Sequence, residues 1–99
     1  MSYNSLDKVT IVMSVLASYL DVDMSEMSNE LRKKENKYIF LLLLNNYKCF
    51  QKDKIKEVLS IISDKSYKNN MDKAQEKFLI NKEFRERYLE IQEGLNKII

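Results

Sequence analysis

The sequence predicts an all-α protein, a single domain (1–99) folded as a compact bundle of about five helices. Three observations predict this fold class. The 99 residues contain no proline and only one glycine, so the turn residues that punctuate β-rich chains are almost absent. Apolar residues recur at spacings of three and four along most of the chain, which is the period of a helix face. With 44% apolar residues, a chain of this length suits one hydrophobic core.

The first helix is predicted at residues 5–20, with Asn4 or Ser5 as its cap. Its apolar stripe consists of Leu6, Val9, Met13, Leu16 and Leu20. The acidic stretch DVDMSEM then ends the helix, and residues 25–31 are expected to form a short helical turn. Asp21 and Asp23 lack the glycine and the closing glutamate of a calcium loop, so we interpret them as solvated loop and cap residues.

A second long helix is predicted at residues 35–47. Its segment IFLLLL, residues 39–44, is apolar on every side of a helix, so we expect other helices to surround it. The run is far shorter than the roughly 18 residues that indicate a membrane span. We therefore predict a buried central helix and no membrane partner.

Two further helices are predicted at 51–62 and 65–80, separated by Ser63 and Asp64 as a capping pair. The first has its apolar face at Ile55, Val58, Leu59 and Ile62. The second has a narrow apolar face at Tyr67, Met71, Ala74 and Phe78. Two amphipathic helices joined by a short turn are typical of a helix-turn-helix, and also of ordinary helical bundles.

The last helix is predicted at residues 83–98, with Asn81 as its cap. Its apolar stripe consists of Phe84, Tyr88, Ile91, Leu95 and Ile98. The alternative is a winged helix-turn-helix, in which a short β-hairpin occupies about residues 78–91. No glycine or Asn-Gly pair marks a hairpin turn there, so we favour the helix.

Charge is distributed unevenly along the chain, although its net value is only +2. Residues 1–31 hold one lysine against five acids, residues 32–77 hold twelve basic residues against six acids, and residues 78–99 hold four of each. A basic block in a small domain is typical of nucleic-acid binding, and lysine is also the commonest solubilising residue on a helix surface.

Catalytic chemistry has few candidate groups. The chain has no histidine, a single cysteine (Cys49), no phosphate-binding glycine loop and no nucleophile elbow. We predict that the protein is not an enzyme, binds no metal or other cofactor, and keeps Cys49 as a small packed residue. A lone cysteine also excludes an internal disulfide, and the N-terminus lacks a signal peptide, so we expect a cytoplasmic location.

The outward face of the helix at 65–80 is the strongest candidate site. In a helix-turn-helix the second helix enters the major groove of DNA, where lysine donates to guanine or phosphate and asparagine bonds adenine. The residues expected to approach the bases or phosphates there are Lys65, Ser66, Lys68, Asn69, Asn70 and Lys73. Lys52 and Lys54 of the preceding helix are expected to hold phosphates.

Much of the chain, about residues 9–97, resembles the C-terminal DNA-binding domain of the bacterial replication initiator DnaA, a helical module related to the Trp repressor. The resemblance rests on VLASYLDVDMSEM (15–27), LRKKENKYIFLLLLNNY (31–47), FQKDKIKEVLS (50–60), MDKAQEKF (71–78) and INKEFRERYLEIQEGL (80–95). It implies a helix-turn-helix that binds duplex DNA, with Arg32, Lys33 and Lys34 contacting the minor groove and phosphates. The family's Asp-His-Thr-Thr signature would fall on residues 67–70, which read YKNN, so the resemblance does not carry over the family's target sequence.

A second resemblance, over residues 55–80, is to winged helix-turn-helix domains. It places the same residues on the recognition helix and implies a basic wing made of Lys82, Arg85 and Arg87. Together these patterns predict a small non-enzymatic protein that binds double-stranded DNA. The richness in Lys, Asn, Ile and Tyr indicates an AT-rich genome, and we expect a replication, transfer or transcription accessory factor of a plasmid, phage or other mobile element.

The alternative function is a helical protein-interaction module, an inhibitor or adaptor that does not bind DNA. Its candidate surfaces are Tyr3, Tyr47 and the apolar stripe of the last helix, which would also serve a homodimer. Because a dimer suits a palindromic DNA site as well, that stripe does not discriminate between the two functions.

Overall fold

The computed structural model describes residues 5–47, 52–59 and 63–98, and these residues form helices connected by short turns. In chain order the elements are α1 (Ser5–Leu20), the 3-10 helix η1 (Met24–Glu26), α2 (Met27–Glu30), α3 (Lys34–Asn46), α4 (Lys52–Leu59), α5 (Asp64–Ile80) and α6 (Lys82–Asn96). The prediction of an all-α bundle is confirmed. Asn4, predicted as a helix cap, and Cys49, predicted as a packed residue, lie outside the described residues.

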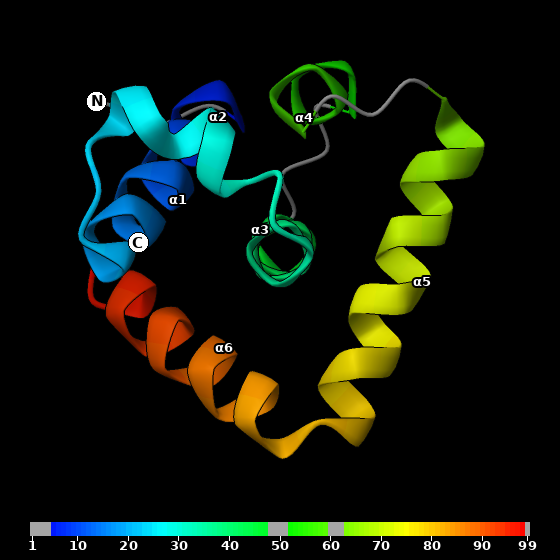
Figure 1. The fold of residues 1–99 in the computed structure, drawn as a ribbon. Helices are drawn as coiled ribbons and strands as arrows, with labels where there is room; N and C mark the ends of the chain where they lie inside the picture. Colours follow the sequence, from blue (N-terminus) through cyan, green and yellow to red (C-terminus); the bar gives the residue numbers. More distant parts are fainter. Residues whose placement is uncertain (1–4, 48–51, 60–62, 99) are drawn as a thin grey trace.

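Helix α3 occupies the centre of the molecule, and the other helices surround it (Figure 1). Ile39, Phe40, Leu41 and Leu43 all have zero exposure to solvent, which confirms the prediction from the apolar run. Each such side chain stabilises the fold by about 1.5–3 kcal/mol relative to an exposed position, so this helix contributes most to the core.

Helix α1 ends at an aspartate in a left-handed backbone conformation. Asp21 has φ 58°, and the amide of the next residue, Val22, donates to the carbonyl of Ala17 at 3.0 Å. Glycine usually occupies such a position, but aspartate tolerates it better than most side chains do. The chain can therefore end this helix without a glycine.

The burial of α1 differs in detail from its predicted stripe. Val9 and Leu16 are buried as expected, but Met13 and Leu20 are only half-buried, and Val12 is completely buried instead. Both α3 and α6 pack against α1, so the buried face is broader than a single stripe and is centred differently. The side chain of Leu6 lies outside the described part of the chain.

A sharp corner joins α5 to α6 at a single residue, Asn81. Its backbone is extended (φ −109°, ψ 109°), and its Oδ1 accepts a hydrogen bond from the amide of Phe84 at 2.9 Å, as a helix N-cap does. Arg85 donates from Nη1 to the carbonyls of Phe78 and Leu79, both at 3.1 Å, and so satisfies the end of α5. The alternative prediction of a β-hairpin at 78–91 is wrong, because this segment consists of the end of α5 and most of α6, with Asn81 as the cap between them.

Helix α6 buries the stripe predicted for it, except at its end. Phe84, Tyr88, Ile91 and Leu95 are buried, whereas Ile98 follows the helix and is 62% exposed. The stripe therefore faces the core along the helix, and only Ile98 is left exposed at its end. Among the residues that the structure describes, no helix is long and apolar enough to cross a bilayer.

Candidate nucleic-acid interface

Helix α5 is fixed mainly by α3 and α6, which are its most extensive packing partners. Ala74 is fully buried, and Tyr67, Met71 and Phe78 pack half-buried against the core, so the inward face is as predicted. The ring of Phe78 meets that of Tyr88 on α6 edge to face, with centroids 5.4 Å apart and planes at 87°. Because these contacts pack the inward face of α5 against the core, its opposite face is exposed to solvent.

The outward face of α5 exposes most of the residues predicted to meet DNA. Lys65, Lys68, Asn69 and Lys73 are all exposed along the first half of the helix. The three ammonium groups form no ion pair with a carboxylate in the described part of the chain. Asp72 is exposed beside them and makes this face less positive than the lysines alone would.

The two adjacent asparagines differ in how free their side chains are. Asn70 is half-buried, and its Nδ2 donates to the carbonyl of Ser66 at 2.8 Å, within the helix itself. Ser66 is also half-buried, and its amide donates to the Oγ of the N-cap Ser63 at 3.1 Å. Asn69 is exposed, so it is the better placed of the two to bond a base edge.

The basic segment before α3 lies on the surface and is held by the residues around it. Arg32, Lys33 and Lys34 are exposed, and Lys33 Nζ lies 2.8 Å from a carboxylate oxygen of Glu30. The buried side chain of Asn36 donates from Nδ2 to the Glu30 carbonyl at 3.2 Å, which ties the end of α2 to the first turn of α3.

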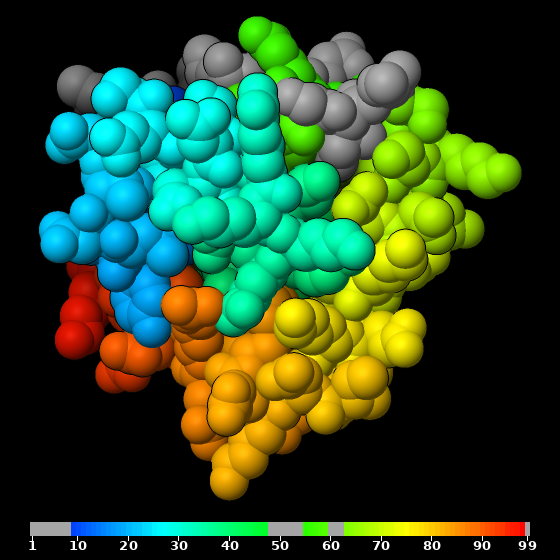
Figure 2. Space-filling view, viewed as in Figure 1, coloured from blue at the N-terminus to red at the C-terminus, as the bar shows by residue number. Residues whose placement is uncertain are grey.

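This basic segment and α5 are reached from one side of the molecule. Figure 2 shows the side chains around the start of α3 next to those of α5 on the same face. Tyr38 of α3 and Lys73 and Lys77 of α5 line one shallow pocket where the two helices meet. A long polyanion can therefore contact both elements at once.

Helix α4 precedes α5 in the chain. An ion pair between Lys56 Nζ and Asp64 Oδ1, 2.8 Å apart, joins the two helices. The side chains of Lys52 and Lys54, which were predicted to hold phosphates, lie outside the described part of the chain.

The three residues assigned to a basic wing have other surroundings. Lys82 is exposed at the start of α6, with its Nζ 4.0 Å from Glu86, and Arg85 is occupied by the carbonyls at the end of α5. Arg87 pairs with Glu35 of α3. Without a hairpin in this segment, the predicted role of these residues in a wing has no structural basis.

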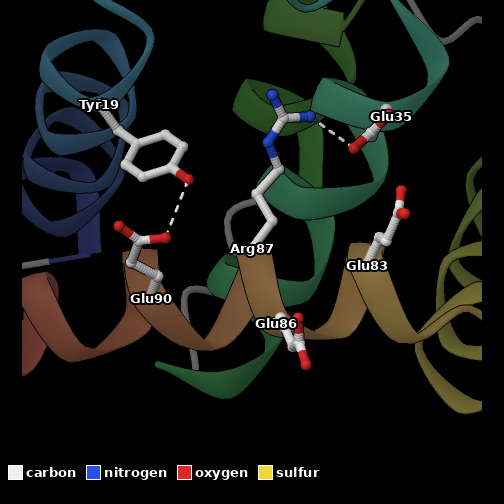
Figure 3. Close-up of a pocket in the computed structure, with 6 residues that line it drawn as sticks. All are labelled: Tyr19, Glu35, Glu83, Glu86, Arg87 and Glu90. Atoms are coloured by element: carbon white, nitrogen blue, oxygen red, sulfur yellow. Dashed lines mark hydrogen bonds and ion pairs between the residues drawn. The ribbon is translucent and has the colours of Figure 1, made fainter.

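Arg87 lies in an acidic pocket that the sequence did not predict (Figure 3). The other residues that line it are Tyr19, Glu35, Glu83, Glu86 and Glu90. Partial burial lowers the pKa of Arg87, but the hydrogen bond and the charge of Glu35 more than offset this, so its pKa is raised. The pocket has four carboxylates and one guanidinium, so it is negatively charged and is itself unsuited to DNA phosphates.

The spacing of the glutamates in α6 is the sequence feature that could have predicted the acidic pocket. Glu83, Glu86 and Glu90 recur at spacings of three and four, so they share a helix face, yet the equal numbers of acids and bases in residues 78–99 hid this face. In the described part of the chain, His, Cys, Asp and Glu residues form no group of three or more that could hold a metal ion.

Comparison with known proteins does not extend this description. The chain matches no protein-family model, and neither the curated proteins nor the solved structures contain a match to it.

Proposed function

We propose that this chain is a small DNA-binding protein that presents the outward face of α5 to duplex DNA. The observation that carries the proposal is the set of three exposed lysines and one exposed asparagine, Lys65, Lys68, Asn69 and Lys73, on a helix whose other face is packed into the core. A packed helix whose exposed lysines form no ion pair with any described carboxylate, and which also displays an amide, suits a groove, because phosphate contacts give affinity and amide contacts distinguish bases.

The basic segment Arg32–Lys34 is the second part of the proposed interface. It lies on the side of the molecule from which α5 is also accessible, and its three residues are exposed. In this proposal α5 enters the major groove and the segment holds the adjacent backbone. The acidic pocket around Arg87 borders this segment, because Glu35 directly follows Lys34, and its negative charge limits how the DNA can lie on the protein.

Binding to a fluorescently labelled duplex, measured by anisotropy at several salt concentrations, tests the proposal. The logarithm of the affinity should fall linearly with the logarithm of the salt concentration, with a slope of about −0.9 for each phosphate neutralised. A matched control is Lys97→Gln, which removes an exposed lysine from the far end of α6 and should leave the slope unchanged. Absence of binding to any duplex at low salt contradicts the proposal.

Base reading needs a separate experiment. After selection of a preferred site from random duplexes, Asn69→Ala should reduce the preference for that site over random DNA by about tenfold, as the loss of one bidentate base contact does. Asn70→Ala is the matched control, because the side chain of Asn70 is bonded to its own helix. Equal losses on specific and random DNA would show that Asn69 contacts only the backbone.

A further inference from the structure

Acidic residues border the basic segment 32–34 in the chain, one before it and one after it. Glu30 precedes the segment, and its carboxylate lies 2.8 Å from Lys33 Nζ, so one cation of the segment is already paired. Glu35 directly follows Lys34, and its side chain is 41% exposed. A carboxylate in this position can pair with a second cation of the segment and so compete with a DNA phosphate for it.

The structure gives Glu35 a partner outside the segment. Arg87 extends from α6 toward the start of α3, and its Nη1 donates to Glu35 Oε1 (Figure 3). Arg32 and Lys34, in contrast, form no ion pair with a carboxylate in the described part of the chain. The acid next to the segment is therefore occupied by a residue 52 positions further along the chain.

This ion pair has little to contribute to the stability of the fold. The side chains of Arg87 and Glu35 are 39% and 41% exposed, and solvent and salt screen a pair that is this exposed. The two helices also meet through a buried hydrogen bond, which the hydroxyl of Tyr88 on α6 donates to the carbonyl of Leu42 on α3 at 3.5 Å. The main effect of the pair is therefore to direct the Glu35 carboxylate toward α6.

We propose that Arg87 is a positioning residue for DNA binding: it holds the Glu35 carboxylate toward α6 and so leaves Arg32 and Lys34 free to bind phosphates. Arg87 itself does not touch the DNA. This role rests on the proposed function and adds to it a residue that lies outside both parts of the interface. It differs from the direct contact that the sequence predicted for Arg87 in a basic wing.

The salt dependence of duplex binding gives the size of the expected effect. In the Arg87→Gln variant the released Glu35 carboxylate pairs with Arg32 or Lys34, and one phosphate contact is lost. The slope of log affinity against log salt should then become flatter by about 0.9. Because the counterion contribution vanishes near ~1 M salt, this change corresponds to roughly eightfold weaker binding at about 0.1 M salt.

A double-mutant cycle with Glu35→Gln distinguishes positioning from direct contact. Glu35→Gln alone should not weaken binding, because Arg32 and Lys34 stay unpaired. In the Arg87→Gln background the same substitution should restore the slope and most of the affinity, because no carboxylate remains there to pair with the segment. A slope that stays flat in the double variant would mean that Arg87 binds a phosphate itself, and this overturns the proposal.

Glu83→Gln is the matched control for the rescue. Glu83 lines the same acidic pocket and carries the same charge as Glu35, but it lies on α6 and does not adjoin the basic segment. In the Arg87→Gln background it should restore neither the slope nor the affinity. Equal rescue by Glu83→Gln and Glu35→Gln would mean that only the net charge of the pocket matters, which overturns the proposal.

Thermal unfolding followed by circular dichroism separates positioning from a structural role. Every variant should melt close to the unmodified chain, because the ion pair is half-exposed. Unfolding of Arg87→Gln at the assay temperature would make the pair a structural one and overturns the proposal. If the unmodified chain and Arg87→Gln bind duplex equally well, the role of Arg87 alone is overturned. If the unmodified chain binds no duplex, the proposed function fails, and the role of Arg87 fails with it.

Discussion

Replacement of Asn36 by aspartate is the sharpest test of how the basic segment is held in place. Asn36 is the buried polar side chain of α3, 5% exposed, and its Nδ2 donates to the carbonyl of Glu30 at 3.2 Å. Asn36→Asp changes the shape of the side chain very little. It replaces the donor with a carboxylate oxygen that faces a carbonyl oxygen, so a favourable contact becomes a repulsive one.

The magnitude follows in two steps from the geometry. Asn36→Ala removes one hydrogen bond, but the Glu30 carbonyl still accepts from the amide of Lys33 at 3.1 Å, so the loss should be about 1 kcal/mol. Asn36→Asp also buries an unpaired charge, which raises the loss to about 3–5 kcal/mol at pH 7. This is a large fraction of the roughly 5–15 kcal/mol that stabilises a domain of this size.

The pH dependence distinguishes a buried charge from a simple loss of packing. Burial should raise the pKa of the introduced carboxyl above its unfolded value of about 3.9, so the destabilisation develops as the pH rises above that value. Urea unfolding of both variants and of the unmodified chain at pH 4 and pH 7 gives the difference in unfolding free energy. If Asn36→Asp and Asn36→Ala cost the same at both pH values, the side chain does not occupy the buried donor position assigned to it.

Three further substitutions test other parts of the fold. Burial raises the pKa of Tyr88 to about 12, so between pH 10 and 12 this tyrosine ionises in the unfolded chain before it does in the folded one, and the free energy of unfolding should fall by about 2–3 kcal/mol. In urea unfolding at alkaline pH, Tyr88→Phe should remove this fall, and an unchanged fall would refute the burial of the Tyr88 hydroxyl. Asn81→Ala should cost about 1 kcal/mol by thermal unfolding, through loss of the cap on Phe84, and no cost would mean that the cap is dispensable. Phe40→Ala should cost about 3–5 kcal/mol in urea, and a loss below 1 kcal/mol would contradict its central position.

The helices were predictable because the relevant signals are local. The spacing of apolar residues identified the buried faces of α5 and α6, and Ser63 and Asn81 were recognisable as caps. The corner at Asn81 was harder to predict, because the sequence around it is compatible both with a β-hairpin and with two helices separated by a cap. The contacts of Arg85 with the end of α5 decide between them, and they become visible only once the helices are placed.

The candidate site was only partly predictable. Exposure of Lys65, Lys68 and Lys73 follows from the helical period, but the difference between Asn69 and Asn70 depends on a side-chain bond within the helix. The pairing of Arg87 with Glu35 joins residues 52 positions apart and could not be inferred from spacing. Long-range pairs of this kind depend on how helices pack, and helix periodicity alone does not specify that packing.

The central claim is that the outward face of α5 neutralises DNA phosphates, and the salt dependence of a triple variant tests it most directly. Lys65, Lys68 and Lys73 together should account for about 2.7 of the slope of log affinity against log salt, at about 0.9 per contact. The account predicts that the combined Lys→Gln substitutions flatten the slope by about this amount while circular dichroism stays unchanged. An identical slope for the triple variant and the unmodified chain would contradict it.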